Sequence, residues 1–255
     1  PSSMTRFLEE MPNRGLLVLA GLGNSPGGRK PILFQTNPKY RYILGLEISR
    51  IYSVLGLYDM HLTPLSLARW KMDEHMTPEV LADLVTDTAK RFLHEHGITS
   101  ADVLGLGIGA VGPLDHQNGI ILEPEWFPAP SWRHVPICAM LEERLGIPAQ
   151  LDNGANTALI GEHWALRSDT IRHALYVHVG VNIRSAAMSE GRILRGAADT
   201  EGAIGQMIIQ MNGPKLRNKG NSGALEAFVS VPALEDRVRA ELKSGRSSVL
   251  SSLAP

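Results

Sequence analysis

Two runs of three short strand-like segments, separated by helical stretches, restrict the fold of this chain more than any other feature. The six segments cover residues 42–49, 51–58, 65–70, 173–180, 182–189 and 192–196. A three-strand unit that occurs twice, with helices between the copies, predicts two related α/β lobes rather than one uniformly wound sheet.

The stretches between these segments predict helices and further strands. Thr77-Pro78-Glu79 is a strong helix start, because it offers a capping residue, a proline in the first turn and an early acid. Apolar residues then recur at helical spacing until Gly97. The remaining predictions are strands over residues 103–110 and 148–152 and helices over residues 136–145 and 155–166.

The composition fits a folded, globular chain. Of the 255 residues, 44% are apolar and 20% are charged, which argues against a disordered protein. No stretch approaches the roughly 18 consecutive apolar residues of a membrane span. Cys138 is the single cysteine, so neither an intrachain disulfide nor a cluster of zinc-binding thiolates can form. We therefore expect a protein of the reducing cytoplasm that has no membrane partner.

The net charge of −1 conceals an asymmetry along the chain. Residues 1–41 hold six basic and two acidic side chains, whereas the remaining residues carry a net negative charge. A basic segment attached to an acidic body points to nucleic acid. A short solvated surface is the alternative, since a segment of this length can acquire such a balance by chance.

The basic segment also has the outline of a helix followed by a β-hairpin. Ser2 and Ser3 are good helix caps, and Pro12 should kink or end the helix. The apolar stripe of this helix consists of Met4, Phe7, Leu8 and Met11. Residues 16–20 and 31–35 predict two strands, and the glycine-rich loop between them cannot be helical. This outline matches the last part of a winged helix-turn-helix, so we expect the earlier helices of that domain to be absent from the chain.

Six glycine-rich or polar motifs follow one another along the chain. They are Gly27 to Pro31, Gly112-Pro113, Asp152 to Asn156 with Glu162 after it, Gly196-Ala197, Gly202 to Gly205, and Gly220 to Ser230. Their order and spacing resemble the ROK family of sugar kinases and sugar-responsive repressors. The resemblance implies an α/β, actin-like ATPase (ribonuclease H-like) fold of two lobes, preceded by a partial winged helix-turn-helix. It implies the end of the DNA-binding domain over residues 1–40, a first lobe over 41–170 and an incomplete second lobe over 171–255.

The chain departs from this family at the positions that kinase activity needs. Phosphate loops use glycines so that backbone N–H groups can approach the phosphates. The family's Asp-Ile-Gly-Gly-Thr is replaced by Glu47 to Ile51 (Glu-Ile-Ser-Arg-Ile), and one of four glycines survives in the second loop over residues 180–186. Gly154 stands where the family has its general base, and Asp152 lies two residues earlier. We therefore predict no catalytic residue, no cofactor and no enzymatic activity.

The family's metal and sugar ligands are also changed. The positions of its structural zinc ligands are occupied here by Gln206, Arg217, Lys219 and Ala224, so we predict no metal site. The family's Glu-Ile-Gly-His, which contacts sugar, is replaced by Ala203 to Gln206 (Ala-Ile-Gly-Gln). The residues that the resemblance leaves for binding a sugar effector are Asn153, Gln206 and Glu226. For Glu226, an acid that stabilises a helix start is an equally good interpretation.

The resemblance implies a DNA-binding transcriptional regulator, a repressor of sugar-related genes whose body serves as effector and dimerisation module. Its partners would be double-stranded operator DNA, a sugar or sugar-phosphate effector, and a second copy in a homodimer. The predicted DNA contacts are Ser2, Ser3, Thr5, Arg6, Gly27, Gly28, Arg29 and Lys30. Two alternatives remain open: a sugar kinase that phosphorylates a hexose or amino sugar with ATP, and an interaction module that has lost both DNA and sugar binding.

Overall fold

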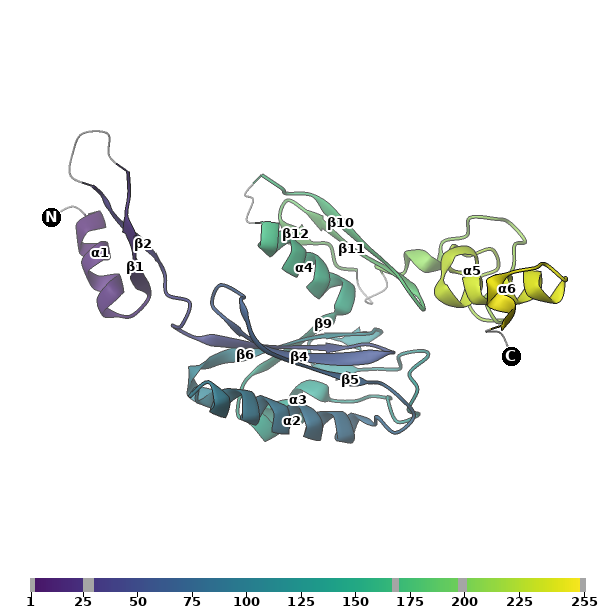
Figure 1. Ribbon diagram of the computed structural model, residues 1–255, viewed down its shortest axis with the longest axis horizontal. Coiled ribbons are helices and arrows are strands. Elements are labelled where there is room, and N and C mark those ends of the chain that lie inside the picture. Colours follow the sequence, from purple (N-terminus) through teal and green to yellow (C-terminus); the bar gives the residue numbers. More distant parts are fainter. Residues whose placement is uncertain (1–2, 25–29, 167–169, 197–200, 253–255) are drawn as a thin grey trace. The chain divides into compact units, whose positions relative to one another are not determined.

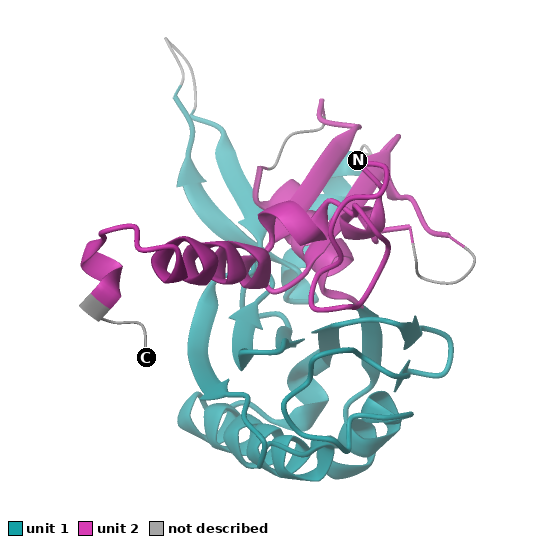
Figure 2. Cartoon of the chain, turned by 90° about the vertical axis from the view of Figure 1, so that its right-hand side faces the viewer, with its two compact units in different colours: residues 1–152 teal, residues 153–255 magenta. Residues whose placement is uncertain are grey.

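The computed structural model of the chain consists of two compact units, residues 1–152 and residues 153–255 (Figure 2). It describes residues 3–24, 30–166, 170–196 and 201–252. Within these ranges, no helix combines the length and the apolar content that are needed to cross a bilayer.

The first unit begins with one helix and a two-stranded hairpin (Figure 1). Helix α1 (Ser3–Asn13) ends one residue after Pro12, and β1 (Leu17–Leu22) pairs antiparallel with β2 (Ile32–Thr36). Gly15 turns the chain between helix and strand at a φ of 74°, a left-handed conformation that glycine adopts without strain. The helix and both strands predicted for this segment are confirmed, whereas the winged helix-turn-helix itself stays a prediction.

A five-stranded sheet forms the body of the first unit. Its strands are β3 (Tyr42–Ile48), β4 (Tyr52–Asp59), β5 (Pro64–Lys71), β6 (Val103–Ala110) and β9 (Ala149–Asn153). They lie in the order β5-β4-β3-β6-β9, and β3 pairs antiparallel with β4 and parallel with β6. Helices α2 (Pro78–Glu95) and α3 (Ile137–Leu145) cover one face of this sheet (Figure 1). The smaller elements are η1 (Ser100–Asp102), β7 (Leu114–Asp115) and β8 (Ile120–Ile121).

The main core lies between the sheet and these helices. Leu44 on β3 and Leu55 on β4 are completely buried, as are Leu81 and Val85 on α2. Alternate positions of the strands and every third or fourth position of the helix supply these side chains, so the two apolar faces meet. Each fully buried leucine contributes roughly 1.5–3 kcal/mol of transfer free energy.

The start of α2 shows how the local sequence determines an element. The Thr77 hydroxyl accepts a hydrogen bond from the Val80 N–H over 3.3 Å, and Pro78 is the first helical residue. Proline is suited to this position, because the first N–H groups of a helix have no partner within it. The predicted helix start is therefore confirmed.

The second unit is built on a smaller sheet. Its elements are α4 (Gly154–Leu166), β10 (Ala174–Val179), β11 (Ile183–Ser189) and β12 (Arg192–Ile193). The three strands pair antiparallel in the order β10-β11-β12, which confirms the second three-strand unit. The second unit begins at residue 153, and Ala155 and Leu159 of α4 pack against Ala186 and Met188 of β11. The lobe boundary predicted at residue 170 stays a prediction.

Beyond this sheet the second unit consists of short helices and an extended loop. The helices are η2 (Ile204–Gln206), α5 (Glu226–Val229), α6 (Val231–Lys243) and η3 (Val249–Ser252). Between η2 and α5 the chain turns repeatedly through left-handed conformations at Asn212, Arg217, Asn218, Gly220 and Gly223. Such backbone geometry requires contacts elsewhere that hold the loop in place.

Strand β10 lies at the edge of the small sheet. Among the residues that the structure describes, it pairs with β11 on one side only. Its side chains Leu175, Val177 and Val179 are 68%, 45% and 57% exposed. The second unit therefore presents an apolar strand edge.

Cys138 on α3 should react slowly with thiol reagents. It is buried, and desolvation, with a smaller contribution from the Glu142 charge, raises its pKa to about 11. The thiolate is the reactive form, so labelling by an aromatic disulfide at pH 8 should be on the order of 100-fold slower in the folded protein than in urea. Absorbance of the released thiol measures both rates, and rapid stoichiometric labelling of the folded protein would contradict the burial.

Candidate nucleic-acid interface and effector site

The predicted DNA contacts that the structure describes fall on α1 and in the segment that joins β1 to β2. Thr5 and Arg6 are exposed on α1, and Lys30 is exposed two residues before β2 begins. Ser3 is the first residue of α1. The other predicted contacts, which lie outside the described residues, are Ser2, Gly27, Gly28 and Arg29. The structure therefore places a basic side chain on the helix and another beside the hairpin strand.

The hairpin is joined to the five-stranded sheet by the turn that follows β4. The Met60 N–H donates to the Pro38 carbonyl over 2.9 Å, and the His61 imidazole Nε2 lies 2.8 Å from the Thr36 hydroxyl. Asp59 shapes this turn, because its carboxylate accepts from the N–H groups of His61 and Thr63 at 2.8 and 2.9 Å. Sequence reasoning missed this joint, although an aspartate that precedes such a turn is a recognisable signal.

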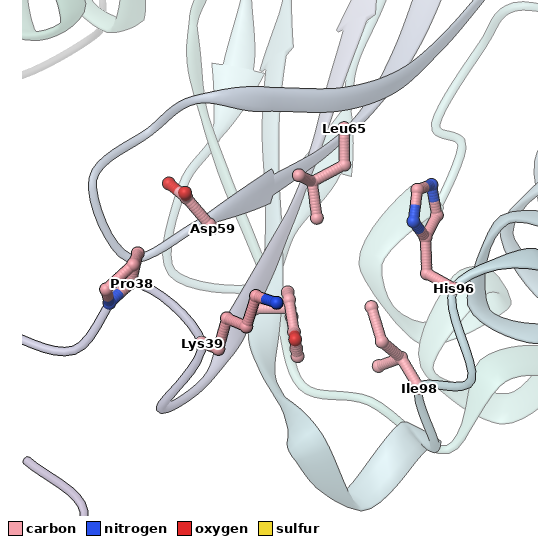
Figure 3. A pocket seen from close by; sticks show the side chains of 7 residues that line it. Pro38, Lys39, Asp59, Leu65, His96 and Ile98 are labelled. Atoms are coloured by element: carbon pink, nitrogen blue, oxygen red, sulfur yellow. The ribbon is translucent and has the colours of Figure 1, made fainter.

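A pocket with a volume of about 260 Å³ lies beside this joint (Figure 3). Its lining comes from the segment before β3, the ends of β4 and β5, and the segment after α2. The lining residues are Pro38, Lys39, Tyr42, Asp59, Leu65, His96 and Ile98. Its volume lies just below the roughly 300 Å³ at which ligand pockets typically start.

The first phosphate-loop position is occupied by a tight turn. Ser49 makes two hydrogen bonds to the Tyr52 carbonyl, from its N–H at 3.1 Å and from its hydroxyl at 2.7 Å. Arg50 donates from Nε to the carbonyl of Glu125 over 2.7 Å. The guanidinium thus holds a loop that lies 75 residues away in the sequence, in place of the open backbone that a phosphate cradle needs.

The position at which the family has its general base forms the start of a helix in this chain. Gly154 opens α4, and the Asn153 side-chain oxygen accepts from the Ala155 N–H over 3.0 Å. Asp152, at the end of β9, lies 3.7 Å from the His116 imidazole, and that Nδ1 is also 3.4 Å from the Leu151 carbonyl. Asn153 therefore helps to start a helix, and Asp152 lies beside a histidine of the first unit.

Gln206 and Glu226, two of the predicted effector residues, are brought together in the second unit. The Gln206 amide donates from Nε2 to Glu226 Oε2 over 2.8 Å, and Glu226 Oε1 accepts from the Ile183 N–H at 2.8 Å. Glu226 is 6% exposed. It is the first residue of α5, but these bonds lead to β11 and η2, so its contacts extend beyond those of a helix-start acid.

The loop at the zinc-ligand positions is held by polar side chains. Arg217 donates to Asp236 and to Glu235 on α6, each over 3.3 Å. The hydrogen bond to Asp236 is the main cause of a raised Arg217 pKa, so the guanidinium stays charged. Lys219 closes a backbone turn, and Ala224 is buried. In the described part of the chain, no group of three or more His, Cys, Asp or Glu side chains could hold a metal ion.

Known proteins with similar sequences include both repressors and kinases. The xylose repressor of Caldicellulosiruptor bescii is 27% identical over 246 residues, which is 96% of this chain and 60% of the repressor. The glucokinase of Thermotoga maritima is 32% identical over 149 residues, covering 58% of this chain and 46% of the enzyme. The chain therefore spans at most about 60% of the length of these relatives.

A solved structure shares the fold. A ROK family transcriptional regulator, described as a homologue of the E. coli MLC protein, superposes with a TM-score of 0.75 and 20% identity. The superposition covers 100% of this chain and 63% of that one, and it confirms the α/β fold. The sequence model of the ROK family matches residues 43–254. The chain belongs to the ROK family.

Proposed function

We propose that this chain is the DNA-reading end and effector body of a sugar-responsive transcriptional repressor that acts in the cytoplasm. One observation carries the proposal. The alignment with the xylose repressor covers 96% of the chain, so it takes in most of the segment before residue 43, where the ROK match begins. The glucokinase alignment covers 58%. Helix α1 and the β1–β2 hairpin lie in that extra segment.

The geometry of this segment suits a DNA reader. In a winged helix-turn-helix, one helix enters the major groove, and a hairpin loop next to it contacts the backbone or the minor groove. Helix α1 would be the recognition helix, with Thr5 and Arg6 towards its start, and the hairpin would be the wing. Two half-sites on an operator would then require a homodimer, since operator symmetry mirrors protein symmetry.

The body supports effector binding rather than phosphoryl transfer. The tight turn at Ser49 and the bond from Arg50 to Glu125 occupy the first phosphate-loop position, and Gly154 supplies no base. The polar cluster around Glu226 offers hydrogen-bonding groups of the kind that recognise sugar hydroxyls. Xylose is the first effector to test, because a relative that covers 96% of this chain is a xylose repressor.

Removing the two wing cations tests the DNA-binding assignment. The double substitution Arg29→Ala, Lys30→Ala should weaken binding to all DNA sequences. It should also reduce the magnitude of the slope of log affinity against log salt concentration by about 1.8, which is about 0.9 for each lost phosphate contact. Fluorescence anisotropy with DNA from upstream of the gene, at 50 to 200 mM KCl, measures this slope. The matched control is Lys90→Ala, Arg91→Ala, which removes two exposed cations of α2. An equal slope in both double variants would remove the wing from the interface.

The kinase alternative has its own readout. Asp152 is the carboxylate nearest in sequence to the lost base, and its Oδ1 lies 3.7 Å from the His116 Nδ1. A coupled assay of ADP release from ATP, with glucose, xylose and N-acetylglucosamine, should show no turnover above background. Robust turnover that disappears in Asp152→Asn would replace the repressor proposal with a sugar kinase.

A further inference from the structure

The Gln206 side chain bridges a buried carboxylate and an exposed loop. Its Nε2 donates to Glu226, and its Oε1 accepts from the Asn221 N–H over 3.0 Å. This orientation is fixed by chemistry, because a carboxylate can only accept and a backbone N–H can only donate. The Asn221 side chain adds a third bond, to the Gln206 carbonyl at 2.9 Å. One amide thus connects helix α5 with the loop that precedes it.

The loop backbone passes close to this amide. Gly220 has a φ of 67°, and a β-carbon at this position would lie 2.6 Å from Gln206 Oε1. The left-handed backbone conformation favours glycine at residue 220, and a larger residue there would also make the amide shift. The loop backbone is closed over Gln206, which is half-buried, and Gln206 in turn lies against Glu226, which is buried.

Glu226 is the acceptor that a polyhydroxylated ligand would need. Its Oε1 is committed to the Ile183 N–H on β11, which holds the carboxylate in place. Its Oε2 accepts from the Gln206 amide, a side chain that can rotate away. A sugar hydroxyl is a donor of the same kind, so it can make the bond that the amide makes now.

We propose that Gln206 is a displaceable latch over Glu226. A neutral sugar donates a hydroxyl to Glu226 Oε2, displaces the Gln206 amide and so releases the Asn221 N–H and loosens the turn at Gly220 and Asn221. The proposal rests on the proposed function, because it deepens the effector site of the repressor. It accounts for the replacement at residue 206, because an amide can donate to the carboxylate and accept from the loop at once. Binding of the effector at the carboxylate therefore also removes a hydrogen bond from the loop.

Hydrogen exchange measured residue by residue tests the latch without any ligand. In Gln206→Ala the Asn221 amide loses its acceptor, so its exchange should accelerate about tenfold. Gln210→Ala, which truncates an exposed glutamine four residues later, is the matched control and should change nothing. Unchanged exchange at Asn221 in Gln206→Ala overturns the latch.

A second variant distinguishes the latch from simple loss of packing. Glu226→Gln keeps an oxygen for the Ile183 N–H but turns the other acceptor into a donor, which opposes the Gln206 amide. The Gln206 amide must then flip, which presents its own donors to the Asn221 N–H. Exchange at Asn221 should accelerate as in Gln206→Ala, while the Ile183 amide stays protected. Protection of both amides would also overturn the proposal.

Addition of sugar completes the test. Saturating xylose, glucose or N-acetylglucosamine should accelerate exchange at Asn221 in the wild-type protein and leave Gln206→Ala unchanged, whereas a rigid site would become more protected. A sugar that alters operator affinity without this acceleration overturns the latch and leaves the repressor proposal standing. A sugar that accelerates exchange at Asn221 but leaves DNA binding unaltered supports the latch and contradicts the repressor proposal. If exchange at Asn221 responds to none of the three sugars, none of them displaces Gln206, and the latch is overturned for these sugars.

Discussion

Replacing Leu44 by alanine is expected to lower the free energy of unfolding by about 3 to 5 kcal/mol. Leu44 is completely buried on β3, and its cross-strand neighbours are Leu57 on β4 and Leu106 on β6, which are equally inaccessible. A central strand with neighbours on both sides cannot collapse into the space that the lost methyl groups leave. The cost therefore includes a cavity as well as the transfer free energy.

Leu67 provides the control for this prediction. It lies on β5, at the edge of the same sheet, and its side chain is 59% exposed. Leu67→Ala removes the same atoms from a site that water already reaches, so the loss should stay below about 1 kcal/mol. Urea unfolding followed by tryptophan fluorescence compares the two variants, and equal midpoints would contradict the assignment of the core.

Replacing Arg6 by alanine is expected to weaken operator binding by about 10- to 100-fold. This prediction depends on the proposed placement of α1 in the major groove, where a guanidinium that contacts a base edge contributes about 1–3 kcal/mol. Arg6 is exposed on α1. Loss of a base contact affects the specific sequence more than a scrambled one, so the ratio of the two affinities should fall as well.

Arg14 is the matched arginine at the other end of the same segment. It pairs with Glu10 at 3.5 Å, one turn earlier, and both side chains are at least half exposed. Arg14→Ala removes the same charge but should change operator affinity less than about threefold, since an exposed pair of this kind contributes little. Anisotropy titrations with the operator and with a scrambled duplex compare the variants, and equal losses would show that net charge alone governs binding.

The periodicity of the sequence predicts the elements well, because each depends on neighbours along the chain. The strand predicted over residues 103–110 is β6, and the helix predicted from Thr77 begins at Pro78. The same is true of α1 and its hairpin. In each case the alternation of apolar residues, a cap or a proline decides the structure within a few residues.

The contacts that define the candidate sites could not be predicted in the same way. Arg50 reaches a carbonyl 75 residues later, and Asn221 meets Gln206 across a loop of left-handed turns. Such pairs depend on how loops cross in three dimensions, which no local pattern encodes. Family resemblance predicted Gln206 and Glu226 as effector-binding residues, which stays a prediction, and it did not indicate that they bond to each other.

The open edge of β10 has a consequence for handling the isolated chain. Within the described residues β10 has a neighbouring strand on one side only, and with the exposed side chains Leu175, Val177 and Val179 it is a template on which another strand can assemble. Concentrated samples should therefore form edge-to-edge aggregates whose growth depends on concentration. A lysine in place of Val177 introduces the charge with which natural edge strands discourage such stacking, and it should keep the chain dispersed.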